Sequence, residues 1–149
     1  FEYLDINNRR FHSQNIGCAQ CGPRVSIWKN REPLNLYNHQ AIKLLAERLE
    51  AGNLVAIKGI GGYHLSADAF NFQAVSRLRS LKKRSSKPLA IMFPNLDQVK
   101  EFFWLSDLEE QALKAKEAPI VLLNFKNHAS WLNWIAPNLH NVGVMLPYT

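Results

Sequence analysis

A glycine-rich stretch in the first half of the chain could bind an anion. It follows the apolar run Leu54–Ile57 and reads Lys58-Gly59-Ile60-Gly61-Gly62-Tyr63-His64-Leu65. Glycines accept positive φ and let backbone N–H groups approach a ligand's oxygens, while Lys58 adds a full charge at the end of the expected strand. The pattern is neither Gly-x-Gly-x-x-Gly nor Gly-Lys-Ser/Thr, so by itself it favours a plain strand-to-loop turn.

Two polar residues close to these glycines carry open alternatives. His64 could act as a general base, donate a hydrogen bond to a phosphate, or be held by a structural hydrogen bond. Asp68 could bind Mg²⁺ or cap the turn that follows, and capping is the commoner role. No Ser-His-Asp arrangement follows from the spacing.

The segment Arg77–Lys87 is the second candidate for anion binding. It holds six lysines and arginines in eleven positions and no aromatic residue. Cations near the C-terminus of a helix complement the negative end of its dipole. The simplest explanation of this segment is therefore a solvated helix face with its cations pointing outward. Pro88 and an apolar run follow at once, so Arg84 and Lys87 should lie at a sheet edge, where they could bind a triphosphate. RNA is the alternative partner, although the segment offers no ring on which a base could stack.

Two cysteines, Cys18 and Cys21, have the spacing of half a tetrahedral zinc site. A closed site needs four ligands, and His12 is a possible third. The chain by itself therefore predicts unmetallated thiols, and zinc would need further ligands from sequence upstream. Two cysteines so close together are not a secreted disulfide framework, so a reducing compartment is expected.

Alternating strands and helices are expected to position these groups, because the apolar periodicity changes repeatedly along the chain. This alternation predicts an α/β domain with a parallel or mixed sheet. Trp131 and Trp134 should lie in one helical turn packed on the core. Strands are expected at 25–28, 54–58, 88–93, 120–125 and 142–146, of which 54–58 should be buried. Helices are expected at 38–52 with Asn38 as its cap, at 71–83 with Asn71 as its cap, and after the cap pairs Asn95/Gln98 and Ser106/Glu109.

Composition fits a globular domain with an anionic partner. The 149 residues are 47% hydrophobic and 20% charged, with a net charge of +6 and a pI near 9.5. This excess favours nucleotides, phosphorylated metabolites or RNA. The sequence shows no membrane-spanning run and no leader, which predicts a soluble, cytoplasmic protein. It begins at Phe1 and stops at Thr149, as expected of a piece of a longer protein.

Four segments together resemble the HypF family of hydrogenase maturation carbamoyltransferases. Their order and spacing span nearly the whole chain, from the end of a zinc-finger region (1–24) into a YrdC-like nucleotide-binding domain (25–149). The resemblance implies an open, twisted, mixed sheet with flanking helices, truncated at the C-terminus. The segments are Asp5 with Arg9–His12 and Cys18–Arg24; Lys58–Leu65 with Asp68; Arg77–Met92; and Gly143–Thr149.

The resemblance also implies an activity. In the family, carbamoyl phosphate yields carbamate, which the YrdC-like domain joins to ATP, with Mg²⁺, as carbamoyl-adenylate. A following domain passes the carbamoyl group to a cysteine thiol of a HypE-like partner, where it becomes the cyanide ligand of [NiFe]-hydrogenase. Zinc is implied for the full-length protein, with Cys18 and Cys21 as two of its ligands.

Matched to the family's pattern, Lys82 and Arg84 hold the Lys-x-Arg positions that bind the nucleotide phosphates. The resemblance also places Lys58, Gly61 and Gly62 at the wall of the pocket, and His64 and Lys87 complete the predicted phosphate-binding set. The family's Ser-x-Asn element is absent, so little activity is expected of this chain alone. The alternatives are a YrdC-type module that binds RNA, double-stranded RNA included, a threonylcarbamoyl-adenylate synthase acting in tRNA modification, or a non-catalytic scaffold. Cys18-x-x-Cys21-Gly22 and Leu146-Pro147-Tyr148 argue against the tRNA-modification branch.

Overall fold

The computed structural model describes residues 2–8, 10–13, 17, 22–59, 61–126 and 129–147. The chain divides into two compact units, Phe1–Glu47 and Arg48–Thr149. The boundary between residues 24 and 25 that the sequence suggests stays a prediction. None of the helices in the described ranges is both long and apolar enough to cross a membrane.

The first unit contains an antiparallel pair, β1 (Ser26–Lys29) and β2 (Glu32–Tyr37), which leads into α1 (Asn38–Glu50). Asn30 and Arg31 both have positive φ, as a two-residue turn between twisted antiparallel strands requires. Strand β2 is not predicted from the sequence, because Glu-Pro-Leu-Asn-Leu-Tyr contains a proline and no β-branched residue.

The predicted cap at the start of α1 is wrong. Asn38 has a φ of 48° and is the first residue of the helix. Its Oδ1 accepts a hydrogen bond from the Val25 N–H at 3.1 Å, and its own N–H donates to the Val25 carbonyl at 2.9 Å. The Asn38 side chain therefore ties the helix to the start of β1 instead of capping its first turn.

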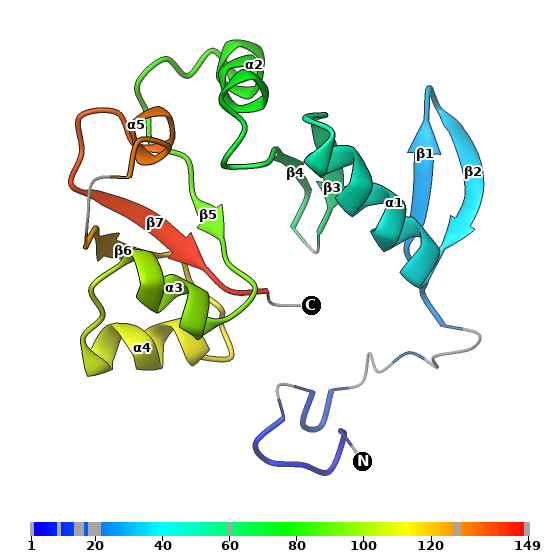
Figure 1. The fold of residues 1–149 in the computed structure, drawn as a ribbon. Coiled ribbons are helices and arrows are strands. Elements are labelled where there is room, and N and C mark those ends of the chain that lie inside the picture. The colour runs from blue at the N-terminus through cyan, green and yellow to red at the C-terminus, as the bar shows by residue number, and fades with distance from the viewer. Residues whose placement is uncertain are drawn as a thin grey trace. The chain divides into compact units, whose positions relative to one another are not determined.

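The second unit is built on a three-stranded sheet in the order β5-β7-β6, with β5 at Ile91–Met92, β6 at Val121–Asn124 and β7 at Asn141–Met145 (Figure 1). Strand β5 runs parallel to β7, and β6 runs antiparallel to it. The mixed α/β class is thus confirmed. The remaining strands form separate two-stranded sheets, so the described residues hold three small sheets.

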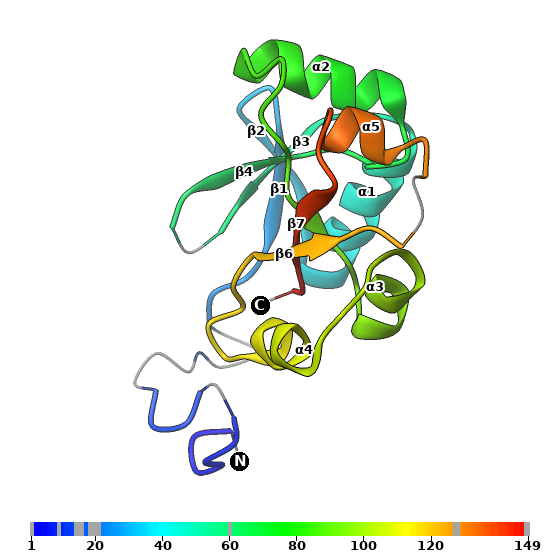
Figure 2. The same ribbon diagram turned by 90° about the vertical axis from the view of Figure 1, so that its left-hand side faces the viewer.

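The helices of this unit form two groups. α2 (Phe72–Lys82) and α5 (Leu132–Ile135) contact each other at one end of the unit, and α3 (Leu96–Phe102) and α4 (Asp107–Lys114) lie at the other, as the two views show (Figures 1 and 2). The predicted caps are confirmed by three side-chain acceptors, each receiving the N–H three residues on: Asn71 from Ala74, Asn95 from Gln98 and Ser106 from Glu109.

The core lies on one face of the sheet. Leu123 pairs with Val142 across β6 and β7, and both are fully buried. Both groups of helices cover this face, through side chains such as Val75, Val99, Phe103, Leu113, Leu132 and Ile135. The neighbouring residue on the other face, Leu122, is 65% exposed. Trp131 is buried, and the Trp134 Nε1–H donates to the Ala69 carbonyl at 3.0 Å, so the core role predicted for these tryptophans is confirmed.

We expect Leu123→Ala to lower the free energy of unfolding by about 2–5 kcal/mol, because it leaves a cavity in the closed face of the sheet. Leu122→Ala is the matched control, one residue along the same strand, and should cost less than about 0.5 kcal/mol. Urea unfolding of the two variants measures both values. Equal losses would contradict the assignment of the buried face.

Candidate functional site

The basic segment begins where α2 ends. Lys83 has a left-handed conformation (φ 50°, ψ 42°), and its N–H donates to the Ser80 carbonyl at 3.1 Å. The Arg84 N–H donates to the Arg79 carbonyl at 3.0 Å. These two bonds make a Schellman motif, which satisfies the last carbonyls of the helix and reverses the chain. Lys82 therefore lies in the final helical turn, and Arg84 lies beyond it.

Arg79 joins this chain reversal to the end of α5. Its Nε donates to the Trp134 carbonyl and its Nη2 to the Ile135 carbonyl, both at 2.8 Å. Its Nη1 donates to the carbonyls of Arg84 at 3.0 Å and Lys87 at 2.8 Å. Burial lowers the pKa of the guanidinium, since the charged form is partly desolvated. The prediction that all cations of this segment point outward is wrong for Arg79, because its donors bind four backbone carbonyls.

Three other cations of the segment face solvent. Lys82, Arg84 and Lys87 are exposed, and none of them forms an ion pair within the part of the chain that the structure describes. A surface hollow adjoins Arg84, while Lys82 is not among its lining residues. The hollow is lined by Ser76, Arg79, Ser80, Lys83, Arg84 and Ser85.

The glycine-rich stretch forms the tip of a hairpin between β3 (Val55–Lys58) and β4 (Tyr63–Ser66). The Gly59 N–H donates to the Gly62 carbonyl at 2.8 Å, so this N–H closes the turn. Gly62 has a φ of 146°, a conformation open to glycine, and nothing lies within 4 Å of a Cβ added at Gly61. The tight turn therefore explains why glycines are present at the hairpin tip. The backbone around Gly61 remains accessible to a ligand.

Lys58 and His64 lie on opposite faces of this hairpin. Lys58 pairs with Tyr63, and His64 pairs with Ile57. Residues directly opposite in an antiparallel pair share a face, and the face alternates along each strand. The two side chains therefore point to different sides. The strand expected at 54–58 is confirmed as β3, but its expected burial is wrong, because among the described residues it pairs with β4 alone and Ala56 to Lys58 are exposed.

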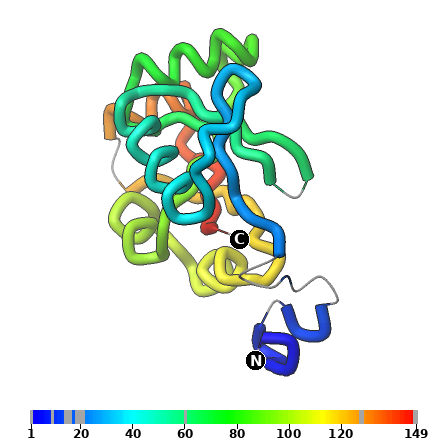
Figure 3. The backbone as a smooth tube through the Cα atoms, turned by 90° about the vertical axis from the view of Figure 1, so that its right-hand side faces the viewer, coloured from blue at the N-terminus to red at the C-terminus, as the bar shows by residue number. Residues whose placement is uncertain are grey.

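The structure places the predicted site residues in two separate sets. The hairpin extends away from α2 (Figures 2 and 3), and no hydrogen bond or ion pair joins the two among the described residues. One set is Lys82, Arg84 and Lys87, and the other is Lys58, Gly61, Gly62 and His64. Asp68 lies between them in the chain, and its Oδ1 accepts from the Phe70 N–H at 2.9 Å, which supports the turn-capping role.

The two predicted zinc ligands, Cys18 and Cys21, lie outside the described residues. His12, the possible third ligand, stacks on Phe11 and Tyr3, with ring centroids 4.1 and 5.0 Å away. Within the described ranges, no three His, Cys, Asp or Glu residues are grouped closely enough to hold a metal ion. The zinc site stays a prediction.

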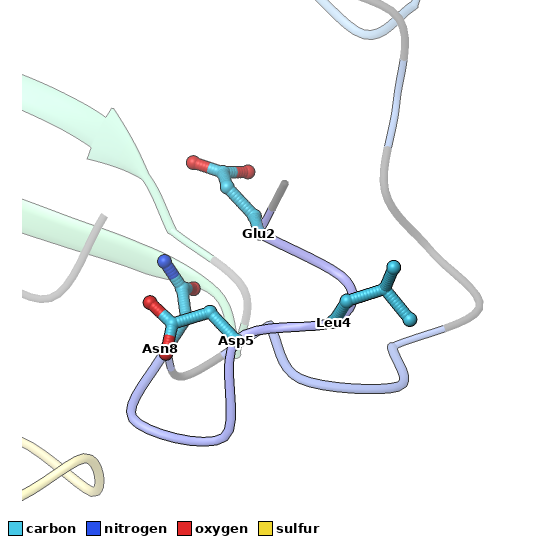
Figure 4. A pocket seen from close by; sticks show the side chains of 4 residues that line it. All are labelled: Glu2, Leu4, Asp5 and Asn8. Carbon is cyan, nitrogen blue, oxygen red and sulfur yellow. The ribbon is translucent and has the colours of Figure 1, made fainter.

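A hollow near the N-terminus is lined by polar groups that already have partners. Figure 4 shows its four lining residues, Glu2, Leu4, Asp5 and Asn8. The Glu2 carboxylate pairs with Arg10 at 2.7 Å, and Asp5 and Asn8 accept from backbone N–H groups two residues along the chain. These contacts stabilise local turns, and we infer no chemistry here.

Two family models match parts of this chain. Residues 47–149 match the family model described as Telomere recombination, which covers Sua5, YciO and YrdC proteins. Residues 1–28 match the model described as HypF finger. The chain therefore belongs to the Sua5/YciO/YrdC family, and a finger segment precedes its YrdC-type α/β region.

The chain is similar to parts of HypF proteins, which confirms the resemblance read from its motifs. It is 43% identical to carbamoyltransferase HypF of Rhodobacter capsulatus, over 99% of this chain and 19% of the relative. It is also 43% identical to HypF of Synechocystis sp., over 85% of this chain and 16% of the relative. A crystal structure of full-length HypF in a phosphate- and nucleotide-bound form matches 99% of this chain and 19% of its own, with a TM-score of 0.77 and 40% identity. The chain thus spans less than a fifth of these relatives.

We expect Lys83→Gly to stabilise the chain by about 0.5–1 kcal/mol, because glycine adopts the left-handed conformation at the end of α2 without steric cost. Leu81→Gly, two residues earlier in the helix, is the control and should destabilise it by about 1 kcal/mol. Thermal unfolding should therefore give shifts of opposite sign. Shifts of the same sign would contradict a helix that ends at Lys82.

Proposed function

We propose that this chain is the part of an ATP-dependent carbamoyltransferase that forms carbamoyl-adenylate. The main support is its 43% identity, over nearly its whole length, to a protein named carbamoyltransferase HypF. The substrates would be ATP, with Mg²⁺, and carbamate derived from carbamoyl phosphate. Because the chain covers less than a fifth of that relative, the remaining domains would supply the other steps.

The proposed step is a displacement at phosphorus. A carbamate oxygen attacks the α-phosphorus of ATP, the bond from this phosphorus to the oxygen that bridges to the β-phosphate breaks, and pyrophosphate leaves with that electron pair. Such a reaction needs alignment and charge neutralisation more than a covalent nucleophile. The exposed cations Lys82, Arg84 and Lys87 form no ion pair among the described residues, so their charge is available to phosphate oxygens.

We assign the cations different tasks on chemical grounds. Arg84 would bind two phosphate oxygens through its planar fork, and Lys82 and Lys87 would act as movable point charges. The HypF relative was solved with phosphate and nucleotide bound, which supports a nucleotide as the ligand class here.

The hairpin tip would supply a second wall of the pocket. Gly61 and Gly62 leave room for a ligand to approach the backbone. Because Lys58 and His64 lie on opposite faces, only one of them would face the nucleotide directly. The hairpin would also have to be held near α2 by contacts beyond those of the described residues.

The wider assembly is part of the same proposal. A HypE-like protein would accept the carbamoyl group on a cysteine thiol, in the maturation of the cyanide ligand of [NiFe]-hydrogenase. The match to the HypF finger supports zinc in the full-length protein, with Cys18 and Cys21 as half of the ligands. We expect little adenylation by the 149-residue chain alone.

The full-length protein should release AMP and pyrophosphate from ATP only when carbamoyl phosphate is supplied. Product formation is followed with and without carbamoyl phosphate, and with threonine plus bicarbonate as the control for a threonylcarbamoyl-adenylate synthase. Threonine dependence, or binding to double-stranded RNA without any ATP turnover, would overturn the proposal.

Lys82→Ala and Arg84→Ala should each weaken ATP binding to the full-length protein by about 10- to 100-fold, the loss expected for one charge-assisted hydrogen bond. Calorimetric titration with ATP measures the dissociation constants. Lys114→Ala is the matched control, because it also removes a positive charge, but from α4, where Lys114 pairs with Glu110. Unchanged affinity in the first two variants would remove these residues from the site.

A further inference from the structure

We propose that Arg79 is a positioning residue, which fixes the loop Arg84–Lys87 so that its cations meet the nucleotide. This inference rests on the proposed function, since it concerns the same phosphate site. It gives Arg79 a task that differs from that of its basic neighbours, because its guanidinium binds protein carbonyls rather than ligand oxygens.

The contacts of Arg79 hold both ends of the loop at one atom. Its Nη1 donates to the carbonyls of Arg84 and Lys87, at 3.0 and 2.8 Å. The loop between these two carbonyls therefore curls around a single nitrogen. Since both Nη1 protons are used, a shift of either end of the loop would break one of these two charge-assisted hydrogen bonds.

The other edge of the guanidinium anchors this loop to the core. Nε and Nη2 donate to the carbonyls of Trp134 and Ile135, at 2.8 Å each. The Ile135 carbonyl also accepts the Leu89 N–H at 2.9 Å, directly before β5. Ile135 is buried, so this anchor belongs to the rigid part of the unit.

Four of the five guanidinium N–H groups of Arg79 thus donate hydrogen bonds, which diverge within the guanidinium plane. A lysine in this place keeps the positive charge but has three donors on one atom, and it cannot reach carbonyls on both edges of the guanidinium plane. Arg79→Lys therefore separates the positioning role from a charge effect. If Arg79 acted through its charge on the phosphates, lysine would retain much of the affinity.

The test compares Arg79→Lys, Arg79→Ala and Arg77→Lys in the full-length protein. Arg77 is the matched control, because it lies on the same helix, is exposed, and donates one hydrogen bond, at 3.1 Å to the Gly52 carbonyl. Calorimetry measures ATP affinity, and hydrogen–deuterium exchange measures the protection of the backbone amides in residues 83–89 and, for reference, in α4.

We expect Arg79→Lys and Arg79→Ala both to raise the dissociation constant for ATP at least about tenfold. Exchange in residues 83–89 should become faster while α4 stays protected, and Arg77→Lys should stay within about twofold of the wild type. Wild-type affinity or wild-type exchange in Arg79→Lys would overturn the inference, and so would an equal loss of protection in α4. A wild-type protein that binds no ATP would overturn the proposed function, whereas the exchange result would still report on how Arg79 holds the loop.

Discussion

The guanidinium of Arg79, shared among four backbone carbonyls, is the interaction on which the arrangement of the basic segment depends. This one side chain connects three parts of the chain: the last turn of α2, which carries it, the loop Arg84–Lys87, and the end of α5. Because the carbonyl dipoles compensate its charge, Arg79 can be partly buried without an acidic partner. The exposed cations Lys82, Arg84 and Lys87 form no ion pair among the described residues and can meet an anion.

The packing of α2 and α5 on the core positions this arrangement. Both groups of helices pack on the side of Leu123, Val142 and Val144, which fixes α2 and α5 against each other (Figure 1). Within the described residues, the β3–β4 hairpin is a separate two-stranded sheet. The basic segment is therefore held by the core, whereas no hydrogen bond or ion pair among these residues joins the glycine-rich tip to α2.

Local signals in the sequence predicted much of this fold. Asn71, Asn95 and Ser106 were identified as caps because a short polar side chain three residues before its backbone partner is a local feature. The β2 strand and the role of Arg79 could not be predicted in this way. Arg79 lies in a run of cations that looks uniform, and its carbonyl partners at Trp134 and Ile135 are more than fifty residues away. The sequence likewise put Lys58 and His64 into one pocket, because their strand pairing was not foreseen.

A crystal structure of the full-length protein with a non-hydrolysable ATP analogue would test the central claim most directly. Our account predicts nitrogens of Lys82 and Arg84 within hydrogen-bonding distance of the phosphate oxygens, while Arg79 keeps its bonds to the carbonyls of Arg84, Lys87, Trp134 and Ile135. An Arg79 side chain that leaves these carbonyls to bind phosphate, or a nucleotide bound away from the end of α2, would contradict it.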